Sequence, residues 1–286
     1  MMNTFRFLSS LTIGPLIIFS ANAFFAVSFS LAKWLTAGTS IWIIMFFRFL
    51  AAPIYLGPYC TIKKQPVTIH DWPLLLIRVV CGMGAMTLLF FAYKYGGIAK
   101  STLIFELSIL WTVIIEAIYL KKPLHRYSIA SLPLAFIGLM MVLNISSFNP
   151  IEWGDLFAFI GSLFNAGVYL SLKKLRHTHD TVTLVFWTYL FSCLCMLLPA
   201  SSGLFSLDPQ LLLPLVIFCT FGLIGQLLMT LGFKFSSASV SSIFMMSIVL
   251  FTSITGAVFF NEVFTLQNTM GFVCVVTSLM IVAKYR

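Results

Sequence analysis

Charge is scarce in this chain. Only 9% of its 286 residues are Asp, Glu, Lys or Arg, and just 8 are acidic, whereas 60% are hydrophobic. The mean hydropathy is +1.04. A chain of this composition cannot cover its apolar surface with polar side chains, which excludes a water-soluble globular fold. The bilayer must therefore be its solvent, and we predict an all-α integral membrane protein.

The length and number of the apolar runs predict how often the chain crosses the membrane. A transmembrane helix needs about 20 predominantly apolar residues. About ten such runs occur, at roughly residues 9–32, 39–58, 71–92, 98–120, 125–144, 154–172, 181–200, 209–231, 239–260 and 267–284. Because the loops between them are short, we predict ten transmembrane helices and no soluble domain.

Groupings of residues typical of catalysis or metal binding are missing from the sequence. His70, His125, His177 and His179 fall in loops or at helix ends, without a nucleophile or a carboxylate cluster beside them. His177 and His179 with Asp180 are more typical of a solvated basic loop than of a metal site. No glycine-rich phosphate-binding loop is present. We expect no enzymatic activity, cofactor or metal ion, and no ATPase subunit.

The chain has a formal net charge of +9, and its basic residues are distributed unevenly between the two predicted sides of the membrane. With both termini in the cytoplasm, the cytoplasmic ends and loops hold Arg6, Lys63, Lys64, Lys121, Lys122, Arg126, Lys173, Lys174, Arg176, Lys234, Lys284 and Arg286. The outside loops hold only Lys33, Lys94 and Lys100. This is the positive-inside bias, which predicts the orientation in a bacterial-type inner membrane. We expect these cations to meet anionic lipid headgroups and not nucleic acid.

The chain resembles itself at an offset of 140 residues. Ala92-Tyr93-Lys94-Tyr95 falls on Gly232-Phe233-Lys234-Phe235, and Phe47-Arg48-Phe49-Leu50 falls on Trp187-Thr188-Tyr189-Leu190. A constant register indicates an internal duplication of five helices each. The two predicted repeats are residues 1–148 and 149–286. Because five is odd, the repeats must be inverted in the membrane, as in many secondary transporters, whose binding site lies near the midplane between the repeats.

The duplication also bears on the first apolar run. Arg6 precedes it and Ala21-Asn22-Ala23 lies near its end, which is a pattern that resembles a secretion signal. The corresponding run of the second copy is plainly not a signal. We therefore expect the first run to be a retained helix.

Four short motifs occur in order along the chain. They are Phe47-Arg48-Phe49-Leu50, Ala92-Tyr93-Lys94-Tyr95, Ala99-Lys100-Ser101-Thr102, and Asn261-Glu262 followed by Gly271. As an ordered set they resemble the EamA-like branch of the drug/metabolite transporter superfamily over essentially the full length. That family usually has a proline in the middle of helices four and nine, where this chain has Ile109 and Val249, and an acidic residue where this chain has Lys122. The departures indicate a divergent member.

Four ionisable side chains fall inside the apolar runs, where an unpaired charge is costly. Arg78 and Glu116 lie about seven and about five residues from the cytoplasmic side of consecutive helices, and therefore at similar depth. We predict a structural ion pair between them. Arg48 lies near the middle of its helix, and we predict a scaffold residue that is satisfied by helix-end carbonyls or by a carboxylate.

Glu106 is the fourth ionisable side chain, and its position in the second copy is held by Met246. One interpretation places Glu106 in a central cavity, where it binds a cationic group or carries a coupled proton. The other pairs it with Arg48, which lies at similar depth. Its absence from the second copy favours a functional role, because scaffold features tend to survive in both halves.

The resemblance implies that helices one, three, four, six, eight and nine surround the cavity. On them, the candidate substrate contacts are Asn22, Trp111, Asn165, Tyr169 and Gln226. A lone amide in a transmembrane helix often bonds a neighbouring helix instead. Aromatic residues make up 16% of the chain, so packing is the alternative for the tryptophan and the tyrosine.

These features predict a secondary transporter that moves a small organic metabolite by alternating access. One anionic position in an aromatic cavity suits an amino-acid-like or nucleoside-bearing solute with a positive centre. S-adenosylmethionine fits this description and is carried by some members of the family. Efflux of hydrophobic or cationic compounds uses the same features, and an integral-membrane enzyme or a non-transporting scaffold are further alternatives. The substrate, direction, coupling ion and oligomeric state stay open at this point.

Overall fold

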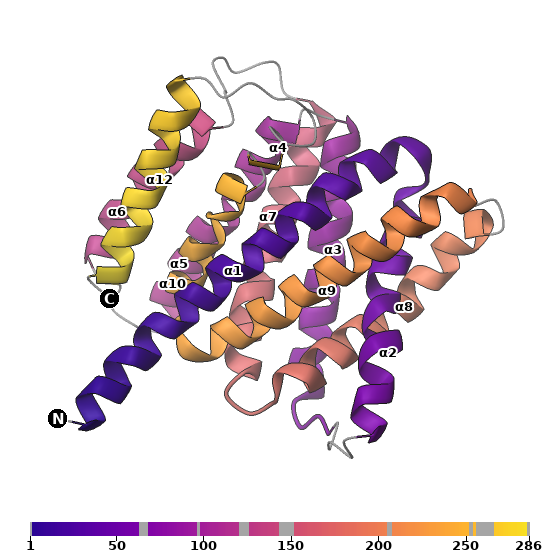
Figure 1. Ribbon diagram of the computed structural model, residues 1–286, viewed down its shortest axis with the longest axis horizontal. Helices are drawn as coiled ribbons and strands as arrows, with labels where there is room; N and C mark the ends of the chain where they lie inside the picture. The colour runs from indigo at the N-terminus through magenta and orange to yellow at the C-terminus, as the bar shows by residue number, and fades with distance from the viewer. Residues whose placement is uncertain are drawn as a thin grey trace.

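The computed structural model describes residues 2–62, 68–95, 98–119, 126–142, 152–204, 208–251, 254–255 and 266–284, and every regular element in these ranges is a helix. The helices are α1 (Met2–Gly38), α2 (Ile41–Ile62), α3 (Trp72–Tyr95), α4 (Ile98–Phe105), α5 (Ser108–Tyr119), α6 (Arg126–Val142), α7 (Trp153–Leu175), α8 (Thr181–Leu204), the 3₁₀ helix η1 (Pro209–Leu211), α9 (Leu212–Phe235), α10 (Ala238–Met245) and α12 (Leu266–Lys284) (Figure 1).

Several of these helices are long and apolar enough to cross a membrane. The 7 candidate spans in the described ranges are Ile13–Thr36, Ile41–Ile62, Trp72–Tyr95, Ser101–Ile118, Trp153–Leu175, Thr181–Gly203 and Pro209–Phe235. The shorter apolar helices Ile129–Met141, Ala238–Phe251 and Leu266–Ile281 fall on the remaining predicted runs. Leu198 is 84% exposed and Leu266 79%, as lipid-facing side chains would be. The protein is multi-pass, and the total of ten crossing helices stays a prediction.

The helices of the two halves pair across the molecule. The main pairs are α1 with α9, α3 with α7, α2 with α8, and α6 with α12. The 140-residue offset carries α1 onto α7 and α3 onto α9, so it exchanges the first two pairs, and it maps the other two pairs onto themselves. A two-fold axis between the repeats produces this exchange of partners. It supports the predicted inverted repeat.

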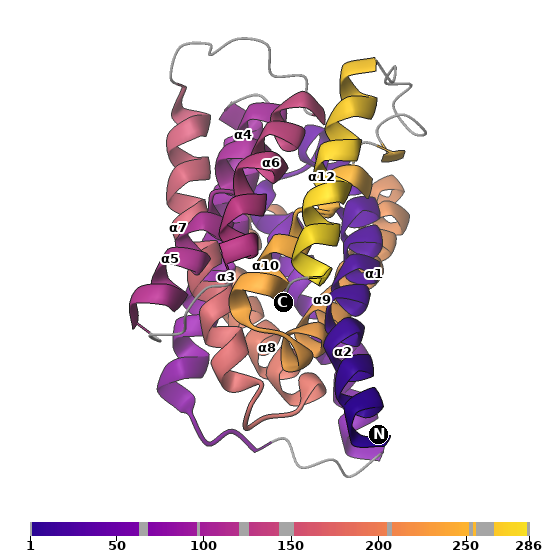
Figure 2. The same ribbon diagram turned by 90° about the vertical axis from the view of Figure 1, so that its left-hand side faces the viewer.

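The pair α6–α12 stands at one end of the molecule, opposite α2 and α8 (Figure 1), and remains side by side in the view turned by 90° (Figure 2). Ser278 Oγ donates a hydrogen bond to Ser131 O at 2.9 Å. A Cβ atom on Gly138 would lie 2.7 Å from Gly271 O. Because the offset maps residue 131 onto 271 and 138 onto 278, these two contacts are equivalents across the two-fold axis. The glycine permits the close approach.

Two of the predicted helices are interrupted at corresponding positions. Glu106 and Leu107 form a turn between α4 and α5, and Met246 and Ser247 form a turn after α10. Amides in each turn pair with the carbonyl three residues back, as Leu107 N does with Ile104 O at 3.1 Å. This 3₁₀-like spacing leaves neighbouring carbonyls available to other donors. The runs predicted as continuous helices over 98–120 and 239–260 are thus corrected: each has a break, although neither has the proline usual in the family.

Candidate functional site

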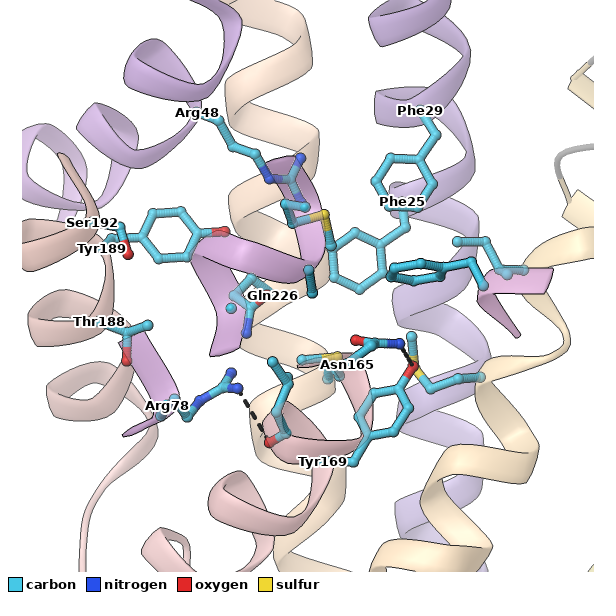
Figure 3. A pocket seen from close by; sticks show the side chains of 18 of the residues that line it. Phe25, Phe29, Arg48, Arg78, Asn165, Tyr169, Thr188, Tyr189, Ser192 and Gln226 are labelled. Atoms are coloured by element: carbon cyan, nitrogen blue, oxygen red, sulfur yellow. Dashed lines mark hydrogen bonds between the residues drawn. The ribbon is translucent and has the colours of Figure 1, made fainter. Parts of the chain in front are cut away.

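A cavity lies between the two repeats. Residues of α1, α2, α3, α7, α8 and α9 line it, together with residues at the end of α4 and around the turn that follows α10 (Figure 3). Six of its lining residues in the first repeat have their 140-offset partner in the lining as well. The pairs are Phe25 with Asn165, Phe29 with Tyr169, Arg48 with Thr188, Phe49 with Tyr189, Met86 with Gln226, and Phe105 with Met245. The cavity therefore lies across the axis that relates the repeats.

The two repeats contribute different chemistry to these paired positions. Five of the six first-repeat members are aromatic or thioether side chains, of which Phe25 and Phe29 stack at 5.9 Å between ring centroids. Their partners in the second repeat are mostly hydroxyl or amide side chains. At these paired positions the first repeat thus contributes mostly apolar side chains and the second repeat mostly hydrogen-bonding ones. Such a cavity can hold a solute with distinct apolar and polar parts.

Arg48 is anchored by neutral groups. Its side chain is 1% exposed, and Nη1 donates to Ser28 Oγ at 3.2 Å. The guanidinium carbon lies 5.4 Å from the ring centroid of Phe218 and 5.7 Å from that of Phe29, within the range of cation–π contacts. Gly222 makes room for it, because a Cβ atom there would lie 2.8 Å from Nη1. The predicted scaffold role thus has a hydroxyl and two rings as its partners, in place of helix-end carbonyls or a carboxylate.

The predicted ion pair between Arg78 and Glu116 is wrong. Arg78 lines the cavity, and its Nη1 donates to Val168 O at 3.3 Å. Glu116 Oε2 instead accepts hydrogen bonds from Ser239 N, at 2.6 Å, and from Ser239 Oγ. Glu116 lies on α5, which packs on α10 as well as on α7, and its carboxylate meets the start of α10 at Ser239. Glu116 therefore caps the positive N-terminal end of α10, outside the cavity.

Glu106 is 6% exposed and lines the cavity from the turn between α4 and α5. Its Oε2 has no hydrogen-bond partner among the residues that the structure describes. The alternative prediction, a pair with Arg48, is not formed there, because Arg48 is directed to Ser28 and the rings of Phe29 and Phe218. A buried carboxylate that faces a cavity is available to a cationic group or a proton.

Two of the other predicted contacts form one cluster in the lining. Asn165 Nδ2 donates to Tyr169 Oη at 3.1 Å and to Ser108 Oγ at 3.0 Å (Figure 3). Ser108 begins α5, so this cluster ties α7 to the break beside Glu106. Gln226, from α9, also lines the cavity, and its Nε2 lies 3.4 Å from Thr230 Oγ1. All three residues are placed where a solute could reach them.

Asn22 and Trp111 do not line the cavity. Asn22 is fully buried, and its Nδ2 lies 3.0 Å from Phe244 O, 3.2 Å from Met245 O and 2.7 Å from Ser247 Oγ. It supplies donors to the break after α10, which is a structural role. Trp111 Nε1 donates to Ser162 Oγ at 3.1 Å, across the contact between α5 and α7.

The profile of the EamA-like transporter family matches residues 12–144 and 152–284, once for each repeat. The chain belongs to the EamA-like transporter family. It is 22% identical over 278 residues to the "Pseudopaline exporter CntI" of Pseudomonas aeruginosa, strains UCBPP-PA14 and PAO1, and the match covers 96% of either chain. A solved structure described as "Crystal structure of protein" matches with a TM-score of 0.79 at 15% identity, over 94% of this chain and 96% of that chain, and shows the fold alone.

The comparison confirms the resemblance predicted from the sequence. Membership in the EamA-like family makes this chain a small-molecule transporter of a membrane and argues against an enzymatic role. Asn261 and Glu262, which carried part of the resemblance, lie outside the described residues, and so does Lys122, one of the departures from the family pattern.

Sequence reasoning missed several polar residues of this EamA-like cavity. Thr188 and Ser192 line it from α8, and their hydroxyl groups are buried without a hydrogen-bond partner in the described part of the chain. Tyr189 lines it too and meets Phe49 edge-on, with 5.3 Å between ring centroids. A signal for them existed: the 140-residue offset maps Arg48 and Phe49 onto Thr188 and Tyr189.

Proposed function

We propose that this EamA-like protein is a secondary transporter that exports a small organic solute through the cavity between its repeats. The observation that carries the proposal is the buried Glu106 carboxylate, which lines the cavity and whose Oε2 has no hydrogen-bond partner in the described ranges. Export is the proposed direction because the relative CntI is named an exporter. The proposed setting is a bacterial inner membrane with both termini in the cytoplasm.

The repeat architecture supports alternating access as the mechanism. The pairs α1–α9 and α3–α7 each join one helix of either half, so rocking about the two-fold axis would exchange the environments of the two pairs. The breaks at Glu106–Leu107 and Met246–Ser247 are points at which a crossing helix can bend. Since Glu106 sits in one of them, bending would change its access to water, which suits a carrier of coupled protons.

The lining supports an amino-acid-like or nucleoside-bearing solute, of which S-adenosylmethionine is one candidate. Glu106 provides a site for a positive centre, and the rings of Phe25 and Phe29 provide a surface for a planar or apolar part. The alternative, efflux of hydrophobic cations, would use the same groups. It is disfavoured by Arg48 and Arg78, because a hydrophobic cation has no carboxylate that could pair with either guanidinium group in the lining.

The test is transport in proteoliposomes loaded with labelled amino acids, nucleosides or S-adenosylmethionine, with and without a proton gradient. We expect export of at least one of them, driven by the gradient and abolished by Glu106→Gln. Glu152→Gln is the matched control, because it removes an exposed carboxylate at the start of α7 and should leave transport unchanged. Transport by Glu106→Gln with unaltered rate and pH dependence would refute the role of Glu106.

A further inference from the structure

The charges in the cavity do not balance. Its lining contains two guanidinium groups, Arg48 and Arg78, and one carboxylate, Glu106, which are 1%, 3% and 6% exposed. The hydrogen bonds of Arg48 and Arg78 go to a hydroxyl and to a backbone carbonyl, and not to Glu106. Buried charges without counter-ions are costly, so a bound solute that supplies the missing charges would be strongly favoured.

One wall of the cavity is rich in hydrogen-bond donors. Arg48 and Arg78 enter it from α2 and α3, on the same side as Thr188 and Ser192 of α8 (Figure 3). A guanidinium has five N–H groups. Among the described residues, Arg48 donates one hydrogen bond, to Ser28 Oγ, and Arg78 donates one, to Val168 O. The hydroxyl groups of Thr188 and Ser192 are buried and unpartnered in the described part of the chain. Such a wall matches anionic groups.

The two guanidinium groups lie apart in the cavity, with Gln226 between them in this view (Figure 3). A single compact dianion, such as a phosphate, would pair with one of them and leave the other without a counter-ion. Two separate monoanionic groups would neutralise both. Carboxylates fit this requirement, because a guanidinium binds a planar carboxylate with two parallel hydrogen bonds.

The other side of the cavity can accept hydrogen bonds. Glu106 Oε2 has no hydrogen-bond partner among the described residues. Asn165 donates to Tyr169 and also to Ser108, which begins α5, so both residues lie beside the break that holds Glu106. A protonated amine has three donors and one positive charge, so it can neutralise this carboxylate. The pattern is thus two positive groups on one wall and one negative group at the break.

We propose that the cavity recognises an amino-dicarboxylate, a solute with two separate carboxylate groups and one protonated amine. Its net charge of −1 balances the lining, with one carboxylate on Arg48, the other on Arg78 and the amine on Glu106. This inference rests on the proposed transport function and names its substrate class. It narrows the amino-acid-like solute with a positive centre that the sequence suggested, because Arg48 and Arg78 share the lining with Glu106 and call for two anionic groups as well.

The test compares solutes of similar size and different charge in the same proteoliposomes. The amino-dicarboxylates are L-aspartate, L-glutamate and L-2-aminoadipate, which vary the distance between the carboxylates. L-glutamine lacks one carboxylate, glutarate lacks the amine, and L-lysine has the opposite net charge. We expect at least one amino-dicarboxylate to be carried about tenfold better, in kcat/KM, than the other three solutes. Equal or better transport of L-glutamine, glutarate or L-lysine would overturn the proposal, and so would failure of all three amino-dicarboxylates.

Two variants give a readout that a purely structural role would not change. Arg78→Gln should erase the preference for glutamate over glutamine, and Glu106→Gln should erase the preference for glutamate over glutarate. Each preference should fall about tenfold, the value of one charged pair, while Glu152→Gln preserves both. Equal loss for all solutes in both variants would refute the assignment. If lysine or S-adenosylmethionine is carried instead, the substrate class is wrong but transport stands; if no solute moves in either direction, the transport function itself fails.

Discussion

Asn22 offers the sharpest distinction between a structural and a substrate-binding role. In the turn after α10, Val249 N donates to Met246 O at 3.1 Å, so Met245 O loses its usual helical partner. Asn22 Nδ2 lies 3.2 Å from that carbonyl oxygen, 3.0 Å from Phe244 O and 2.7 Å from Ser247 Oγ. Asn22→Ala removes these bonds and leaves the broken helix without its donor.

The magnitude follows from these contacts. An amide has two N–H groups, and each net hydrogen bond contributes about 0.5–1.5 kcal/mol, nearer about 0.6 kcal/mol between membrane helices. A buried carbonyl left unpaired costs about 1–3 kcal/mol more. We therefore expect Asn22→Ala to lower the free energy of unfolding by roughly 2–4 kcal/mol. Ser247→Ala should lower it by about 1–2 kcal/mol, because it removes two bonds, the one from Asn22 Nδ2 and the one that Ser247 Oγ donates to Phe244 O.

The assay is equilibrium unfolding in detergent of the wild type, both single variants and the double variant. The effects of Asn22→Ala and Ser247→Ala should be less than additive, because the two side chains share a bond. Below the unfolding transition the KM for the transported solute should be unchanged, since Asn22 lies outside the lining. A variant with unaltered stability and a KM raised tenfold would refute this reasoning and make Asn22 a substrate contact.

Three further predictions test other parts of the structure. Gly138→Ala places a Cβ atom 2.7 Å from a carbonyl oxygen of α12, so it should cost about 1–3 kcal/mol in unfolding free energy relative to Gly57→Ala, whose nearest atom is 3.9 Å away. Equal effects of the two substitutions would contradict the α6–α12 contact. Glu116→Ala leaves the N–H and hydroxyl of Ser239 unpaired and should lower stability by about 2–4 kcal/mol without altering substrate preference; an altered preference would place it in the cavity. Trp111→Phe should leave KM unchanged in transport assays, and a tenfold rise would show that the indole touches the solute.

Composition and register alone were enough to predict the class and the duplication. The scarcity of charge and the long apolar runs require a bilayer, since the apolar surface of such a chain cannot be exposed to water. The constant 140-residue offset indicated two repeats, and the family profile matches each of them. The same offset pairs residues such as Phe25 with Asn165 across the cavity, although only the structure shows that they line it.

The sequence could not determine how each helix is rotated about its axis. In a soluble helix the apolar stripe marks the buried face, but a helix that is apolar all round, as in lipid, carries no such stripe. Arg78 and Glu116 were therefore given the wrong partners. Asn22 and Trp111 were predicted to contact substrate although they face neighbouring helices.

Only the tertiary structure decided which charges share the cavity. Arg48, Arg78 and Glu106 belong to three separate segments, and close packing of those segments with α7, α8 and α9 brings the three side chains into one lining. Sequence by itself determined that this chain is a duplicated membrane protein, because hydropathy and register are properties of the chain, and its ordered motifs indicated the transporter family. The charge pattern of its site depends on packing between helices far apart in sequence, and packing is decided in three dimensions.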